Sequence, residues 1–335
     1  ASEAIAIYLT PPPDFTVNDL IAPAGATSGS RMKVDIVVKN EGASAPHRSE
    51  KYWYDAVYAS RNAVFKREEA ILIGSSIQPE ALIKDNSLIT AGQSYTNSID
   101  ITLPAATSGD WYLHAYTDYQ DNVFEFNKED NNVMSRKITL VNPDFIITGV
   151  TAPGTEYSGS QVNIEYRIKN KGAGKSLDRH QLDVIRISST PSFDHNAVQL
   201  GSLSFSGAMD TGSVLNKEIT VRIPDTLSGL HYLMVETDYN RAQYEEDEAN
   251  NKSAAIPVQI ILSSFPDLKA ISIHAAAGNF VSDSKLGFSY RVQNAGDTDI
   301  VAKSWIDNIY LSKSSTWPAG DAYKLKSIEQ NRTLL

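Results

Sequence analysis

The chain has 335 residues, more than one ordinary domain holds, and 41% of them are hydrophobic, which is enough to form buried cores. Its formal net charge of −10 argues against nucleic acid and anionic membrane surfaces as partners, and no apolar run is long enough for membrane insertion. The absence of cysteine excludes disulfides, thiol catalysis and cysteine-ligated zinc.

The first element in chain order is a short predicted strand. Residues 1–10 alternate apolar and polar side chains and run into Pro11, Pro12 and Pro13. This pattern is typical of a strand followed by a stiff linker. Because residues 138–141 before Pro143 look alike, we interpret residues 1–12 as the last strand and linker of a preceding repeat. We therefore expect the chain to be a piece of a longer protein.

A long phrase of sequence then occurs twice. Residues 109–119 return as residues 229–239, with a constant offset of 120 positions. A fixed period over so many residues indicates a tandem array. Each repeat opens with Pro-Asp and an apolar residue, which places the boundaries at 13–142, 143–265 and 266–335, the third being truncated before its last strands.

The clearest strand of each repeat is the second. Val34, Ile36 and Val38 occupy alternate positions up to Asn40 and so share one face of a strand, and residues 162–170 and 286–294 repeat the pattern. Such alternation predicts an antiparallel sheet with one buried face. The Asn-x-Gly ending predicts a turn that the asparagine side chain stabilises.

Further short strands complete the predicted fold. A third strand is expected at residues 53–60, 181–188 and 305–312, and others around 71–73, 99–101, 109–116 and their counterparts. About seven short strands per repeat, with turns between them and no helical periodicity, predict an all-β chain of tandem immunoglobulin-like antiparallel β-sandwiches.

Several repeated phrases together resemble one family. They are Pro-Asp-Phe, Asn-x-Gly, Trp-x-Asp-x-x-Tyr-x-Ser, Leu-Pro-x-x-x-Ser-Gly, and the acidic turn that ends in Asn131-Asn132. In this order they look like CARDB, a cell-adhesion-related domain of bacteria. The resemblance covers essentially the whole chain and implies an immunoglobulin-like sandwich in a secreted or cell-surface protein. The second repeat departs from it at Gln181 and at residues 241–243.

The acidic turn after the 109–116 strand is the richest candidate for a binding site. Clustered side-chain oxygens are what a hard cation such as Ca²⁺ requires. The candidate ligands are Asp118, Asp121, Glu125 and Asn127 in the first repeat, and Asp238, Asn240, Glu245 and Asp247 in the second. The alternative is that these side chains bond backbone groups of the turn.

Three aspartates share the buried face of the third strand. Asp55, Asp183 and Asp307 have the same parity as the apolar residues two positions later. A buried carboxylate is costly unless it is paired, so we expect these to accept structural hydrogen bonds. The sandwich topology would gather Asp55 with Asp14, Asn40 and Asp118 at one pole.

Aromatic residues form a second candidate surface. Tyr54, Tyr58, Tyr112 and Tyr116 lie on two adjacent predicted strands and are expected to face outward as a flat aromatic platform. Such a platform suits a glycan or protein ligand, although cross-strand tyrosines also stabilise sheets.

Catalytic signatures are missing from the sequence. The histidines do not form His-x-x-x-His or His-Glu-x-x-His, and no Gly-x-Ser-x-Gly elbow or phosphate loop occurs. His114 and His231 are expected to face outward. We therefore expect a non-enzymatic stalk or spacer. The alternatives are a glycan- or protein-binding module, or accessory domains of a secreted hydrolase.

Overall fold

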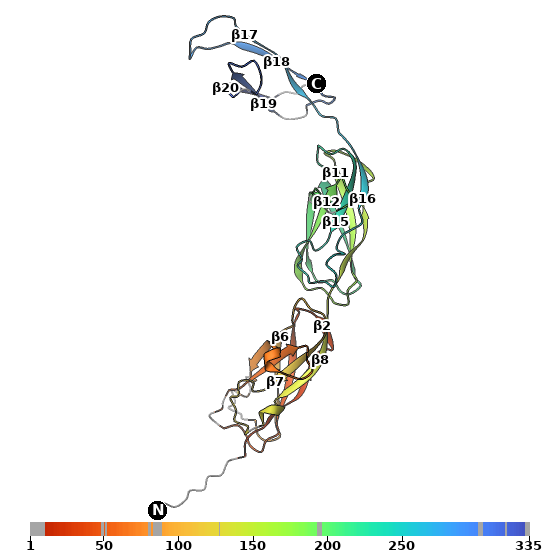
Figure 1. Cartoon of the computed structure of the whole chain (residues 1–335), viewed down its shortest axis with the longest axis vertical. Coiled ribbons are helices and arrows are strands. Elements are labelled where there is room, and N and C mark those ends of the chain that lie inside the picture. The colour runs from red at the N-terminus through yellow and green to blue at the C-terminus, as the bar shows by residue number, and fades with distance from the viewer. Residues whose placement is uncertain are drawn as a thin grey trace, which may run out of the picture. The chain divides into compact units, whose positions relative to one another are not determined.

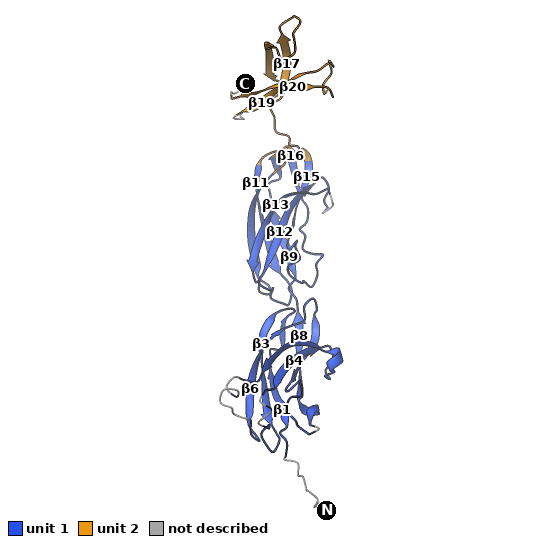
Figure 2. Cartoon of the chain, turned by 90° about the vertical axis from the view of Figure 1, so that its left-hand side faces the viewer, with its two compact units in different colours: residues 1–156, 161–222, 230–259 blue, residues 157–160, 223–229, 260–335 orange. Residues whose placement is uncertain are grey.

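The computed structural model describes most of the chain, namely residues 11–47, 50, 52–79, 82, 89–126, 128–192, 196–300, 304–318 and 320–331. The strand expected within residues 1–10 lies outside these ranges. Two compact units are distinguished: one comprises residues 1–156, 161–222 and 230–259, and the other residues 157–160, 223–229 and 260–335 (Figure 2). Within the described ranges, no helix has the length and apolar character needed to cross a membrane.

The first repeat is a sandwich of two sheets (Figure 1). Its three-stranded sheet has the order β1-β3-β6, and its five-stranded sheet the order β2-β8-β7-β4-β5. Two short 3-10 helices, η1 and η2, lie in its loops. The bounds are β1 Phe15–Ile21, β2 Gly25–Thr27, β3 Arg31–Asn40, β4 Tyr54–Ser60, η1 Arg67–Glu69, β5 Ile71–Ile77, β6 Ser94–Thr102, β7 Gly109–Tyr116, η2 Glu129–Asn131 and β8 Val133–Val141.

The second repeat has the same strand order. Its sheets are β9-β11-β14 and β10-β16-β15-β12-β13. The bounds are β9 Phe145–Thr151, β10 Thr155–Tyr157, β11 Gln161–Asn170, β12 Arg179–Ser188, β13 Val198–Gly207, β14 Val214–Arg222, β15 Gly229–Glu236 and β16 Ile256–Ile261. The recurrence of this order confirms the immunoglobulin-like sandwich expected from the alternating sequence.

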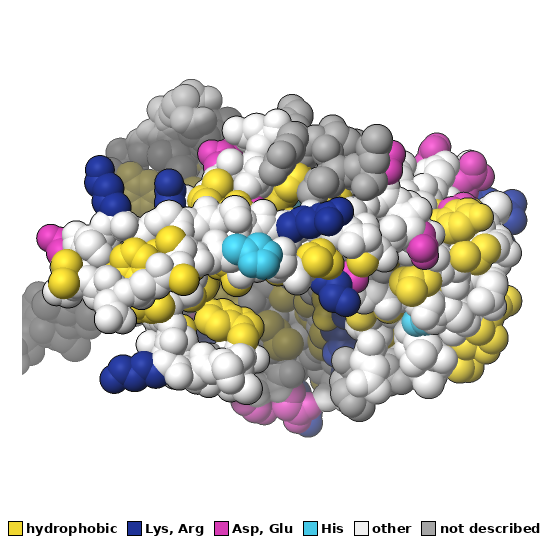
Figure 3. All heavy atoms as spheres, turned by 90° about the horizontal axis from the view of Figure 1, so that it is seen from above, with side chains coloured by type: hydrophobic (Ala, Val, Ile, Leu, Met, Phe, Trp, Pro, Cys, Tyr) yellow, Lys and Arg dark blue, Asp and Glu magenta, His cyan; other side chains and the backbone are white. Residues whose placement is uncertain are grey.

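The described residues after 265 form two hairpins. β17 pairs with β18 and β19 pairs with β20, all antiparallel. Several large apolar side chains of this part are exposed, and yellow hydrophobic side chains are visible among polar ones in Figure 3. The bounds are β17 Leu268–Ala275, β18 Phe288–Asn294, β19 Trp305–Leu311 and β20 Tyr323–Gln330.

The predicted alternation of the second strand is present in the core. Val34, Ile36 and Val38 of β3 are buried against the opposite sheet, as is Asn40 at its end. The residues between them, Asp35, Val37 and Lys39, are more exposed. One face of this strand therefore supplies apolar area to the core, as period-2 alternation requires.

One strand of each complete repeat was not expected. The first strand stops at Ile21, and after Pro23 the chain forms β2, which joins the other sheet by pairing in parallel with β8. Proline cannot donate to the ladder, so pairing with β3 ends there and the chain crosses over. Among the described residues, the first two repeats consequently contain eight strands each, where about seven were expected.

Candidate functional site

Asp118 begins the acidic turn, and its side chain is hydrogen-bonded to the backbone of that turn. It has a φ of 47° and is 1% exposed. Its carboxylate accepts hydrogen bonds from the backbone N–H groups of Asn122 (3.0 Å) and Val123 (2.8 Å). Burial raises the pKa of Asp118 to about 7. Its side chain therefore stabilises the local backbone, as an Asx turn does.

Asp238 repeats this arrangement in the second repeat. It is 1% exposed and accepts hydrogen bonds from the backbone N–H groups of Ala242 (3.0 Å) and Gln243 (2.9 Å). Burial raises its pKa to about 6. The two turns are thus built alike although residues 241–243 differ from their counterparts in the first repeat.

Glu125 and Glu245 connect the turn to the entry of each repeat. Glu125 Oε1 accepts a hydrogen bond from the backbone N–H of Phe15 at 2.9 Å, and Glu245 accepts one from the backbone N–H of Phe145. Both side chains are nearly fully buried. Burial raises the pKa of each carboxyl to about 8. Each glutamate therefore anchors the first strand of its sandwich.

The remaining candidate ligands do not converge with these. Asp121, Asn240 and Asp247 are exposed, and Asn127 lies outside the described residues. Asn240 accepts a hydrogen bond from the backbone N–H of Leu182 at 2.9 Å. Over the described ranges, no three or more His, Asp or Glu side chains gather in a way that could hold a metal ion. The seven candidate ligands within the described residues thus serve mainly as turn and surface groups in the structure.

A different set of polar side chains does gather at the start of each repeat. In the first repeat, Asn131 Nδ2 donates to Asp14 Oδ1 at 2.8 Å, and Asn132 Nδ2 donates to Glu129 Oε2 at 3.2 Å. The backbone N–H of Asp14 donates to Asn40 Oδ1 at 3.1 Å. The paired asparagines after the acidic turn therefore contact the Pro-Asp entry.

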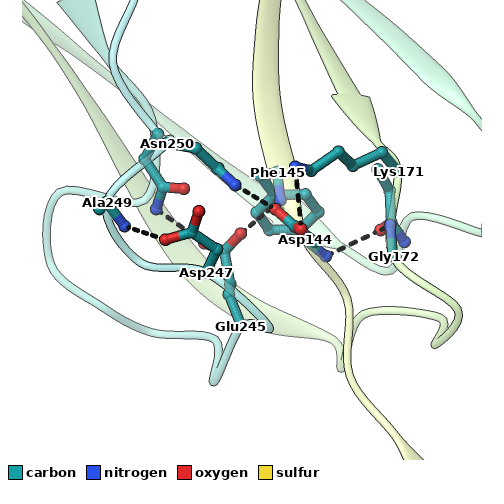
Figure 4. Close-up of polar contacts among 10 residues, drawn as sticks. Asp144, Phe145, Lys171, Gly172, Glu245, Asp247, Ala249 and Asn250 are labelled. Atoms are coloured by element: carbon teal, nitrogen blue, oxygen red, sulfur yellow. Dashed lines mark hydrogen bonds and ion pairs between the residues drawn. The ribbon is translucent and has the colours of Figure 1, made fainter.

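The second repeat contains the same set, drawn in Figure 4 around Asp144. Asn250 Nδ2 donates to Asp144 Oδ1 at 2.9 Å, and Asn251 Nδ2 donates to Glu245 Oε1 at 2.8 Å. The Lys171 ammonium lies 3.3 Å from Asp144 Oδ2. We call these side chains the entry cluster: Asp14, Glu125, Glu129, Asn131 and Asn132 in the first repeat, and Asp144, Glu245, Glu248, Asn250 and Asn251 in the second.

Asp55 lies in the core, where the backbone N–H of Asp118 also donates to its carboxylate. It is fully buried and accepts hydrogen bonds from Tyr95 Oη (2.9 Å), Asn97 Nδ2 (2.8 Å) and Thr117 Oγ1 (2.7 Å). Burial raises the pKa of Asp55, whereas these hydrogen bonds lower it, and the effect of burial is the larger. The carboxylate points inward, as its register predicted, and is paired with core donors.

The other two repeats bind the equivalent aspartate with different donors. Asp183 accepts from Tyr166 Oη (2.8 Å), Lys217 Nζ (2.5 Å) and Thr237 Oγ1 (2.7 Å). Asp307 accepts from Tyr290 Oη at 2.9 Å and from Gln330 Nε2 at 2.9 Å. A hydrogen-bonded carboxylate thus occupies this position in all three repeats, fully buried in the first two and partly exposed in the third, and a tyrosine hydroxyl is among its donors each time.

The four tyrosines do not form the expected flat platform. Tyr58 is 5% exposed and packs edge-on against Phe65, with ring centroids 5.3 Å apart. Tyr116 packs against the same Phe65 at 5.6 Å. Tyr54 and Tyr112 are half-buried. The loop carrying Phe65 covers part of this sheet face, so the tyrosines mainly pack within the sandwich.

The expectation for His114 was wrong. It is fully buried, with Nε2 2.9 Å from Ser60 Oγ and Nδ1 2.7 Å from Ser135 Oγ. Burial lowers its pKa. The Phe65 ring lies 5.2 Å from the imidazole and covers the face that strand parity assigned to solvent. His231 is half-buried.

The burial and the hydrogen bonds of the connection between the first two repeats were not expected from the sequence. Asn142, Pro143 and Asp144 separate β8 from β9 and are all buried. Asn142 Oδ1 accepts from Ser28 Oγ at 2.5 Å, and its Nδ2 donates to the backbone carbonyl of Thr107 at 3.2 Å. The Asn-Pro-Asp sequence marks this segment, but proline indicates only a stiff linker.

Comparison with known proteins points to one family. The CARDB profile matches residues 12–136 and again residues 142–255. Among curated proteins, none matches the chain. Similar solved structures include a CARDB domain from Pyrococcus furiosus, crystallised in complex with di-metal ions (15% identity, 36% of this chain and 90% of that one, TM-score 0.28).

The same domain in solution has 16% identity over 36% of this chain and 98% of that one, with a TM-score of 0.28. Red sea bream transglutaminase has 13% identity over 74% of this chain and 31% of that one, with a TM-score of 0.25.

Proposed function

Since the chain belongs to the CARDB family of cell-adhesion-related domains, we propose that it is a non-catalytic spacer segment of a larger secreted or cell-surface protein. Its tandem sandwiches would hold other parts of that protein apart. The observation that carries this proposal is the short, buried connection between the first two repeats.

This connection is hydrogen-bonded to both sandwiches. On the side of the first repeat, Asn142 contacts Ser28 and Thr107. On the side of the second, the backbone N–H of Gly174 donates to the Asn142 carbonyl at 2.9 Å, and the backbone N–H of Glu246 donates to the Pro143 carbonyl at 2.9 Å. A flexible linker leaves its backbone groups to water. A connection paired on both sides restricts bending, which is the property that a spacer needs.

Spin-label distance measurement on the full chain tests this directly, because the absence of native cysteine allows two labels to be placed cleanly. Lys33→Cys and Thr220→Cys put one label on an exposed strand position of each repeat. We expect one narrow distance distribution. Inserting Gly-Ser-Gly-Ser after Pro143 should broaden it about twofold, since such linkers behave as flexible coils. Distributions of equal width with and without the insertion would contradict the spacer proposal.

A further inference from the structure

The entry clusters contain buried oxygen atoms that receive no hydrogen bond from the described residues. In the first repeat these atoms are Glu125 Oε2, Asn131 Oδ1 and Asn132 Oδ1. In the second repeat they are Glu248 Oε2, Asn250 Oδ1 and Asn251 Oδ1. Buried polar atoms in folded proteins almost always have a partner, so several acceptors without donors in one place require an explanation.

The unpaired oxygens of each repeat belong to one connected set of side chains. Their own carboxamide nitrogens are committed within the cluster: Asn131 donates to Asp14, and Asn132 donates to Glu129. In the second repeat, Asn250 donates to Asp144 and Asn251 to Glu245 (Figure 4). Rotating a carboxamide to satisfy its oxygen would give up the hydrogen bond that its nitrogen donates to the neighbouring carboxyl group, so exchanging the two atoms does not remove the deficit.

The unpaired oxygen atoms are shielded from water. Glu125 and Asn132 are fully buried and Asn251 is 4% exposed, whereas other parts of Asn131, Glu248 and Asn250 are partly exposed. Solvent therefore does not readily supply the missing donor to these oxygens. The oxygens of the paired asparagines are unpaired in both repeats, whereas the unpaired glutamate oxygen belongs to Glu125 in the first and to Glu248, the counterpart of Glu129, in the second. The recurrence at the asparagines, in turns that differ in sequence, argues against an accident of one loop.

The nearby lysines do not satisfy these oxygens. Lys128 Nζ lies 3.5 Å from Asp14 Oδ2, and Lys171 Nζ lies 3.3 Å from Asp144 Oδ2. Each ammonium is thus placed at the outer oxygen of the entry aspartate, with about half of its side chain exposed. The unpaired oxygens of the clusters therefore receive no hydrogen bond from either ammonium group.

We propose that each of these two entry clusters binds one Ca²⁺ ion. The ligands are the unpaired side-chain oxygens of Glu125, Asn131 and Asn132 in the first repeat, and of Glu248, Asn250 and Asn251 in the second. The donor set contains only oxygen, in carboxylate and neutral carboxamide form, which suits Ca²⁺ and its variable coordination. Because two of three ligands are carboxamides, the absence of a cluster of three carboxylates in the described ranges is consistent with this site.

The ion would link three segments of each sandwich. The glutamate comes from the acidic turn, the asparagines precede the last strand, and the hydrogen-bonded Asp14 or Asp144 lies at the entry to the first strand. These ligands are largely distinct from the turn residues that the sequence suggested. Asp118 and Asp238 already bond backbone amides.

Calorimetric titration of the full chain with CaCl₂, after treatment with EDTA and its removal, tests the proposal. We expect two ions per chain. Glu125→Gln should abolish one binding event and Glu248→Gln the other, each with a loss of about 100-fold or more in affinity for its site. Glutamine keeps one acceptor and places an N–H₂ donor beside the unpaired asparagine oxygens, so both variants should melt no lower than the wild type in EDTA.

The matched controls are exposed acidic residues of the same turns. Asp121→Asn and Asp247→Asn each remove one carboxylate from the same loops but outside the entry clusters, and both ions should still bind. Absence of saturable Ca²⁺ binding to the wild type at millimolar concentration would overturn the proposal. Retention of both ions by the Glu125→Gln, Glu248→Gln double variant would overturn it as well, as would Mg²⁺ binding of equal affinity.

Discussion

Tyr95→Phe probes the hydrogen-bond chain at the centre of the first repeat. The Tyr95 hydroxyl accepts a hydrogen bond from Trp53 Nε1 at 2.9 Å and lies 2.9 Å from Asp55 Oδ2, to which it donates. The substitution removes one oxygen atom and leaves the ring packing in place. It therefore tests the polar network with little change in apolar contact.

The expected loss can be worked from these two bonds. Trp53 is 1% exposed, so its indole N–H would be left buried without an acceptor, which costs about 1–3 kcal/mol. Loss of one hydrogen bond to the buried Asp55 carboxylate costs about 1.5–3 kcal/mol. Together we expect a decrease of about 3–5 kcal/mol in the free energy of unfolding of the first repeat.

Urea unfolding of the full chain, followed by the blue-shifted emission expected of buried Trp53, measures this change. Tyr52→Phe is the control, because Tyr52 is 52% exposed. A second variant copies the second repeat, in which the tyrosine that donates to the buried aspartate lies on a different strand. There Tyr166 of β11 stands where the first repeat has Ile36, and Leu215 of β14 stands where it has Tyr95. Ile36→Tyr combined with Tyr95→Leu should return a donor to Asp55. A Tyr95→Phe chain within about 1 kcal/mol of the wild type would refute the reasoning.

Three further predictions concern stability. Lys217→Met leaves the buried Asp183 without its cation and should cost about 3–5 kcal/mol in calorimetric melting, whereas Lys217→Asn, which copies Asn97 of the first repeat, should cost less. Gly42→Ala places a Cβ 2.5 Å from the backbone of Pro13 and Asp14, so it should destabilise by about 2–3 kcal/mol in urea. Gly154→Ala, with no atom within 4 Å, is its control and should be nearly neutral. In EDTA the melting temperature should fall as pH rises from about 5 to 8, because folded Glu125 and Glu245, with pKa values of about 8, hold protons that the unfolded chain has already released. A melting temperature that stays level or rises over this range would contradict that assignment, and Glu125→Gln should flatten the slope.

Much of the fold could be predicted from the period-2 alternation of the strands. The alternation of Val34, Ile36 and Val38 predicted the buried face of β3, and the parity of Asp55 predicted its burial. The short strand β2 carried no such signal, because three residues are too few to show a period. The crossover that it makes depends on pairing with β8, more than 100 positions away.

For the candidate site, the sequence indicated which residue types lie in the turn but not which contacts each of them makes. The sequence pointed to the acidic turn as a cation site, which stays a prediction. In the structure Asp118 and Glu125 are buried and accept hydrogen bonds from backbone amides, which composition alone does not reveal. His114 shows the same difficulty, since strand parity gives the side of a sheet but not what covers that side. Whether the His114 side chain is exposed depends on which side chains pack over that face in the folded chain, and here Phe65 does so.

The parallel pair β2–β8 has a consequence for a chain under tension. Gly25, Ala26 and Thr27 lie beside Thr139, Leu140 and Val141, and the two strands run in the same direction. A pull applied through both ends of the repeat would draw them in opposite directions along their length. The hydrogen bonds between them would then be strained together instead of opening one after another. The first repeat is thus expected to yield in a single abrupt step at high force rather than to unzip gradually.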